Sequence, residues 1–229
     1  QIILLLGGII MKKAFTMAEV LVTLGIIGIV SAMTVPTFLQ NHQRKSYVTQ
    51  IHKIYNEMQQ AALQYMTDRN AVNLIEAGLI TDINAVDTFM KTYFRVIKEC
   101  GENPVDNGCV AQGYKKLTGK TITPFNVSVD YRSYVIASGA VIALFNEGDH
   151  LQVHVDINGQ KGPNIAGRDL FAFHVYKNGV IDDFVSGAIL PPLTREQRED
   201  SYNKWCNSSS AIWYGCLGKL INDNWEMTY

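Results

Sequence analysis

The chain has 229 residues, of which 47% are hydrophobic and 18% are charged. The charged share lies below the roughly 25% of a typical soluble protein, so part of the apolar sequence is expected outside a soluble core. The formal net charge of -1 gives no overall attraction to nucleic acid or to anionic lipid, so nucleic-acid binding is not supported by the charge. The length fits one globular domain with an appended segment.

The N-terminal region reads as a basic leader followed by a membrane helix. Met11-Lys12-Lys13 looks like a normal translation start, and we interpret residues 1–10 as read-through from upstream of it. No charged residue occurs from Val20 to Gln43 if His42 is counted as neutral. The apolar stretch as far as Leu39 is long enough to cross about 30 Å of hydrocarbon. Because basic residues prefer the cytoplasmic side, we expect the N-terminus inside and the chain after Arg44 outside.

Glu19 stands one position before the uncharged run. An unpaired carboxylate carried into a bilayer costs a few kcal/mol, so such residues are usually functional or paired. The sequence therefore predicts a partner for Glu19. The alternative is that Glu19 lies at headgroup level or stabilises the first helical turn through the helix dipole.

Residues 11–30, MKKAFTMAEVLVTLGIIGIV, resemble the prepilin N-terminal cleavage and methylation motif of type IV pilins and type II secretion pseudopilins. The resemblance implies cleavage by prepilin peptidase between Ala14 and Phe15, with Phe15 as the N-methylated first residue of the mature chain. It puts Glu19 at the position of the family's glutamate and Pro36 where many pilins have a helix-kinking proline. Ala14 departs from the more usual glycine before the cut. Close resemblance covers about residues 11–66.

The function implied by this resemblance is structural, not enzymatic. The chain would be a pilin, minor pilin or pseudopilin of a type IV pilus, competence pilus or type II secretion pseudopilus. Its partners would be other pilin or pseudopilin subunits, the prepilin peptidase that also methylates, and an inner-membrane assembly platform. Glu19 would neutralise the amino group of Phe15 on a neighbouring subunit, removing two unpaired charges from an apolar bundle. The subunit would be single-pass in the cytoplasmic membrane and then part of a pilus or pseudopilus.

A competing interpretation is an ordinary secretory signal. Lys12 and Lys13 would form its basic region, and cleavage after Ala32 would release a secreted globular binding domain. Against it stand Glu19 inside that leader and a helical pattern that continues through the proposed cut.

The segment after Arg44 predicts an amphipathic helix. Its apolar residues recur at steps of three and four: Tyr47, Ile51, Ile54, Tyr55, Met58, Ala61, Ala62 and Tyr65. With the membrane half it would form one helix of about 50 residues, bent near Pro36. A second helix is predicted over residues 86–99, where apolar residues again recur at helical spacing.

The region from about Tyr131 predicts four or five antiparallel strands. They cover residues 134–137, 141–145, 151–157, 170–175 and 180–181, with turns at Ser138-Gly139 and Asn178-Gly179. A long N-terminal helix, half transmembrane and half amphipathic, packed on such a sheet gives an α+β fold. We divide the chain into upstream residues and leader (1–14), transmembrane or assembly helix (15–43) and extracytoplasmic head (44–229).

The four cysteines form two close pairs, Cys100 with Cys109 and Cys206 with Cys216. Three pairings are open to them, and two local disulfide loops are the simplest interpretation. Such bridges require an oxidising compartment, whereas the alternative is four reduced, buried thiols. The tail opens with a helix-like run from Arg195 to Lys204 and is rich in aromatic residues around the second pair. It is either an exposed, variable surface as in pilins, or a stapled end packed on the sheet.

Candidate chemistry is sparse. Asp156, Asn158 and Asp169 are candidate calcium ligands, as in the head loop of some pseudopilins, but Lys161 and Gly167 break the EF-hand pattern and a plain turn is the alternative. His150 and His154 would lie about 13 Å apart along a strand, too far for one metal, and are expected to be solvated or packed. The sequence contains no G-x-S-x-G, H-E-x-x-H or P-loop pattern, so we do not expect an enzyme, and the candidate calcium is the one cofactor considered.

Overall fold

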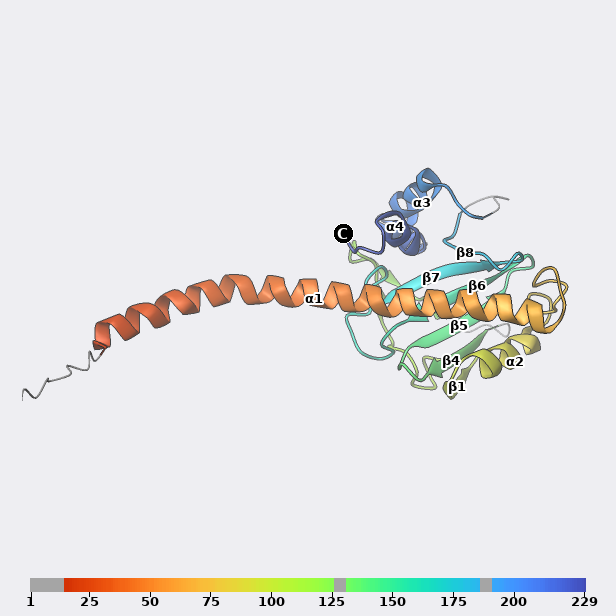
Figure 1. Ribbon diagram of the computed structural model, residues 1–229, viewed down its shortest axis with the longest axis horizontal. Coiled ribbons are helices and arrows are strands. Elements are labelled where there is room, and N and C mark those ends of the chain that lie inside the picture. Colours follow the sequence, from red (N-terminus) through yellow and green to blue (C-terminus); the bar gives the residue numbers. More distant parts are fainter. Residues whose placement is uncertain (1–14, 126–130, 186–190) are drawn as a thin grey trace, which may run out of the picture. The chain divides into compact units, whose positions relative to one another are not determined.

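The computed structural model describes residues 15–125, 131–185 and 191–229 (Figure 1). Met11, Lys12, Lys13 and Ala14 lie outside the described residues. The chain divides into two compact units, Gln1–Gln43 and Arg44–Tyr229. The division falls where the uncharged run ends in the sequence.

The longest element is helix α1, Met17–Asp68, with 52 residues. This confirms one long N-terminal helix. Pro36 lies inside the continuous helix, and the bend expected there stays a prediction. In the head, α1 buries one stripe, as the amphipathic pattern predicts. Its buried residues are Val48, Ile51, Ile54, Met58, Ala61, Ala62, Tyr65 and Met66.

The head is built on a six-stranded, fully antiparallel sheet with strand order β1-β4-β5-β6-β7-β8. The strands are β1 Val96–Gly101, β4 Arg132–Ile136, β5 Val141–Asn146, β6 His150–Asp156, β7 Leu170–Tyr176 and β8 Ile181–Asp182. In the register, Val153 of β6 lies between Leu144 of β5 and Phe173 of β7. A separate pair, β2 Tyr114–Lys115 and β3 Thr121–Ile122, forms a small second sheet. The α+β prediction is confirmed. The sequence predicted four or five strands, and the main sheet has six.

Both faces of the main sheet are covered. Val153, Phe173 and Leu144 share one hydrophobic cluster with the buried stripe of α1, which crosses this face (Figure 1). Val141, Ala143 and Ala172, which alternate with them, belong to a second cluster that includes Trp213 of the C-terminal region. Three hydrogen bonds join α1 to the β7–β8 hairpin: Tyr55 Oη donates to Ile181 O (3.2 Å), Gln59 Nε2 donates to Gly179 O (2.7 Å), and Ile181 N donates to Gln59 Oε1 (3.4 Å).

The prediction of a second helix over residues 86–99 was wrong in its C-terminal part. Helix α2 covers Ile83–Tyr93, and β1 begins at Val96. The Asp82 side chain accepts a bond from Asn84 N and caps the start of α2, while Phe94 is extended, with φ -121° and ψ 146°. The β-branched Val96 then pairs with Ile136 of β4, so sheet pairing replaces the helical continuation.

The C-terminal region contains helix α3 (Arg195–Ser201), a π-helical turn η1 (Tyr202–Cys206) and helix α4 (Cys216–Asn222). Thr194 and Gln197 form a capping box at the start of α3. The helix-like run predicted from Arg195 to Lys204 is therefore confirmed in kind. Helix α4 was not predicted, because its seven residues are too short for a periodic signal.

Candidate functional site

The start of α1 gives Glu19 a partner within its own chain. Thr16 N and Thr16 Oγ1 donate to Glu19 Oε2 at 2.8 and 2.9 Å, and Glu19 N donates to Thr16 Oγ1 at 3.2 Å. This reciprocal arrangement is a capping box, which satisfies backbone donors that begin a helix. It matches the alternative in which Glu19 stabilises the first helical turn. The intersubunit pairing with Phe15 stays a prediction.

The first part of α1 and the residues just before it expose their large apolar side chains. Phe15 is 85% exposed, Phe38 71% and Leu39 53%. The same holds for Met17, Val20, Leu21, Val22, Leu24, Ile26, Ile27, Ile29, Val30, Met33 and Val35. The helix is long and apolar enough to cross a membrane, a test that an N-terminal signal sequence also passes. This surface is compatible with a membrane anchor or a signal sequence, and contiguous apolar area of this kind marks contact with lipid or protein.

The cysteines pair locally, as predicted. Cys100 bonds to Cys109 and Cys206 bonds to Cys216, and no cysteine is left free. Disulfides of this kind persist in oxidising compartments.

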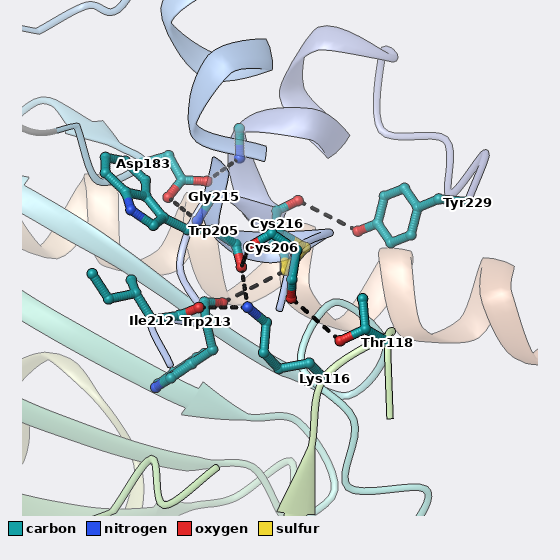
Figure 2. Close-up of a disulfide and its surroundings, with 12 residues drawn as sticks. Lys116, Thr118, Asp183, Trp205, Cys206, Ile212, Trp213, Gly215, Cys216 and Tyr229 are labelled. Atoms are coloured by element: carbon teal, nitrogen blue, oxygen red, sulfur yellow. Dashed lines mark hydrogen bonds between the residues drawn. A yellow bond between two sulfur atoms is a disulfide. The ribbon is translucent and has the colours of Figure 1, made fainter. Parts of the chain in front are cut away.

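A buried lysine organises the loop closed by Cys206 and Cys216. Lys116 is 1% exposed, and its Nζ donates to the carbonyls of Ser210 (3.0 Å), Ile212 (2.6 Å) and Trp205. Figure 2 shows the ammonium pointing into this group of carbonyls beside the disulfide. Two exposed donors extend the pattern, Lys120 to Ser209 O at 2.7 Å and Thr118 to Ser208 O at 3.3 Å. Sequence reasoning missed Lys116, because acceptors on the backbone leave no side-chain signal.

Two buried aspartates join the C-terminal region to the sheet. Asp182 receives two bonds from Arg198, at 2.8 and 2.7 Å. Asp183 accepts from the backbone N–H groups of Phe184 (2.6 Å), Gly215 (2.9 Å) and Gly218. Burial raises the pKa of Asp183 to about 7. These contacts, with the buried Trp205 and Trp213, describe a stapled end packed on the sheet.

The three candidate calcium ligands lie together: both carboxylates are already hydrogen-bonded, whereas Asn158 Oδ1 is buried with no hydrogen-bond partner among the described residues. Asp156 Oδ1 accepts from Asn158 N (3.0 Å) and Gly159 N (2.7 Å), and Tyr114 Oη donates to its other oxygen at 2.5 Å. Asp169 accepts from two backbone N–H groups and from Asn158 Nδ2 (3.3 Å). Within 15–125, 131–185 and 191–229, no group of three His, Cys, Asp or Glu side chains could hold a metal. Burial raises the pKa of both aspartates, and calcium binding stays a prediction.

The two histidines of β6 have separate environments. His154 is 4% exposed, and its Nδ1 lies 2.9 Å from Pro124 O while Nε2 lies 2.8 Å from Gln152 Nε2. Burial lowers the pKa of His154 to about 3. His150 instead stacks on His174, with ring centroids 4.0 Å apart. Both side chains are packed. The sequence predicts either a solvated or a packed environment for them.

Comparisons of the chain with protein-family models, curated proteins and solved structures find no match.

Proposed function

We propose that this chain is a type IV pilin-like structural subunit, made with a short leader, anchored by α1 and polymerised through it. One observation carries the proposal: a continuous helix exposes apolar side chains over its first half, carries Glu19 at its start, and packs its second half on a disulfide-closed head. The prepilin-like run of residues 11–30 gives the same assignment from sequence.

The assembly step follows from electrostatics. Cleavage before Phe15 would create an amino group close to the apolar part of α1, where an unpaired charge is costly. In a bundle of such helices, Glu19 of one subunit would pair with Phe15 of its neighbour, so that both charges are neutralised at one register. Within one chain Glu19 Oε2 accepts from Thr16 Oγ1. On assembly, this local donor would be replaced by the Phe15 amino group of the neighbouring subunit. The proposed location is the cytoplasmic membrane first and a pilus or pseudopilus afterwards.

The first experiment identifies the mature N-terminus. The chain is expressed in a host that contains a prepilin peptidase, and the purified protein is analysed by mass spectrometry. The expected N-terminal residue is Phe15 carrying one methyl group. An N-terminus at Met33 would instead support the second candidate, a secreted binding domain released after Ala32. That candidate rests on the apolar N-terminal segment, which also passes as a signal sequence.

The second experiment tests assembly. Glu19→Gln keeps an oxygen acceptor for Thr16 but removes the charge, so processing should persist while filaments or crosslinked oligomers are lost. Glu226→Gln, at an exposed position of the head, is the matched control and should assemble normally. Wild-type assembly by Glu19→Gln would rule out charge pairing as the basis of polymerisation. The genes beside this one would name the filament system and its assembly platform.

A further inference from the structure

Arg168 carries a buried guanidinium nitrogen without a partner. It lies in the turn between β6 and β7, and its Nη1 is buried with no hydrogen-bond partner among the described residues. The guanidinium carbon lies 5.6 Å from the centroid of the Tyr229 ring, a cation–π contact that leaves the N–H groups unused. The adjacent Asp169 directs its carboxylate to the backbone N–H groups of Asn164 and Ile165 and makes no ion pair with Arg168.

A second arginine adds positive charge near enough to Arg168 to affect it electrostatically. Arg44 is half-buried in α1, and its charge, together with burial, lowers the pKa of Arg168. No ion pair of Arg44 occurs in the part of the chain that the structure describes. Two like charges in a partly desolvated site are unfavourable unless an anion joins them. The pair therefore supplies the positive charge and the hydrogen-bond donors that an anion site uses.

If α1 spans a membrane, the length of its uncharged run determines how deep Arg44 lies relative to the bilayer. Arg44 directly follows the uncharged run from Val20 to Gln43, which rises about 36 Å at 1.5 Å per residue. That length exceeds the hydrocarbon core of about 30 Å, so Arg44 would lie at the headgroup level. Tyrosines also gather here: Tyr47 is one turn along α1, and the Tyr202 and Tyr229 rings lie 5.3 Å apart. Tyrosine is enriched at membrane–water interfaces.

We propose that Arg44 and Arg168 bind the phosphate group of an anionic membrane phospholipid at the surface where the head meets the bilayer. The proposal rests on the membrane anchoring proposed above. Guanidinium groups bind phosphate oxygens bidentately, which suits the unused N–H groups of Arg168. Two positive charges favour a lipid with net negative charge over a zwitterionic one.

The test uses the full chain in uncharged, sugar-headed detergent micelles. Dihexanoyl phosphatidylglycerol is titrated in, and binding is followed by phosphorus NMR. Phosphatidylglycerol should bind more tightly than dihexanoyl phosphatidylcholine. Arg168→Gln and Arg44→Gln should each weaken phosphatidylglycerol binding about fivefold, the effect of about 1 kcal/mol per basic residue near a membrane surface. The exposed Arg95→Gln is the matched control and should bind like wild type.

Wild-type affinity in both Arg168→Gln and Arg44→Gln would overturn the proposal. Arg168→Lys controls for a folding defect, because it keeps the positive charge. It should bind phosphatidylglycerol more weakly than wild type but more tightly than Arg168→Gln. Inorganic phosphate is the third ligand tested. If it displaces phosphatidylglycerol at equal concentration, the site takes any phosphate and the lipid assignment is wrong. Failure of the chain to insert into vesicles would overturn the membrane anchor, whereas the micelle titration reports on the arginine pair separately.

Discussion

The Lys116 ammonium is held by backbone carbonyls rather than by a carboxylate. Buried lysines are rare unless paired, and here three carbonyl dipoles replace the partner charge. All three carbonyls belong to residues 205–212, so one side chain fixes the path of the loop that leads to Trp213. One ammonium group therefore ties three carbonyls of this disulfide-closed loop together.

Lys116→Met should therefore be costly. It keeps the aliphatic volume but leaves three carbonyls without their donor, and each unsatisfied buried group costs about 1–3 kcal/mol. We expect the free energy of unfolding to fall by about 3 kcal/mol in urea denaturation. Lys120→Met, which removes one exposed donor, should cost less than about 1 kcal/mol. Equal losses in the two variants would argue against a special role for Lys116.

His154 should make the protein sensitive to acid. Its pKa is lowered to about 3 by burial, against about 6.5 in an unfolded chain. Between these values the unfolded state binds a proton that the folded state does not, so this residue's contribution to stability falls as the pH falls below 6.5. The slope approaches about 1.4 kcal/mol per pH unit.

The test compares wild type with His154→Gln by denaturation from pH 7 to pH 4. The stability advantage of wild type over the variant should shrink steadily as the pH is lowered. A constant difference across this range would contradict the assignment of His154 as a neutral, buried base.

At the scale of elements, the start of α4 depends on the backbone of Gly215. Its φ is +90°, and a Cβ atom there would lie 2.4 Å from the carbonyl oxygen of Ser201 in α3. Both the left-handed conformation and the close approach of the two helices require a glycine. The packing of α4 on α3 is therefore fixed by the absence of a side chain.

Gly215→Ala should lower the free energy of unfolding by about 3 kcal/mol or more, because backbone strain and a backbone clash add together. Gly119→Ala is the matched control: its φ is +84°, but an added Cβ would meet nothing within 4 Å. It should lose only the cost of the left-handed conformation, about 1 kcal/mol. Similar melting temperatures for the two variants would show that the α3–α4 contact is not tight.

At the scale of the whole molecule, strong periodicity made most of the fold predictable. The stripe of α1 and the alternating residues of β6 and β7 are long signals, and both were recognised. Strand β1 was missed because Lys98, Glu99 and Cys100 carry no alternation and its pairing partner lies far along the chain. In the candidate site, Phe15 and Glu19 came from the motif, whereas Lys116 and Arg168 depend on contacts that only the folded chain creates.

The two disulfides should decide whether the head is stable outside an oxidising compartment. Each closes a short loop, with sequence separations of 9 and 10 residues, worth roughly 2–3 kcal/mol in chain entropy. Replacing Cys206 and Cys216 together by alanine should lower the free energy of unfolding by that amount. Adding a reductant should destabilise wild type more than the variant. A variant as stable as wild type would show that the Cys206–Cys216 bridge does not stabilise the head.

The uninterrupted helix α1 has a mechanical consequence. A pull on its apolar end would pass along the helix axis directly to the buried stripe between Val48 and Met66 and to the bonds of Tyr55 and Gln59. Because these contacts lie along one helix, tension would load them together. Single-molecule pulling from the two chain ends would measure the force at which they rupture.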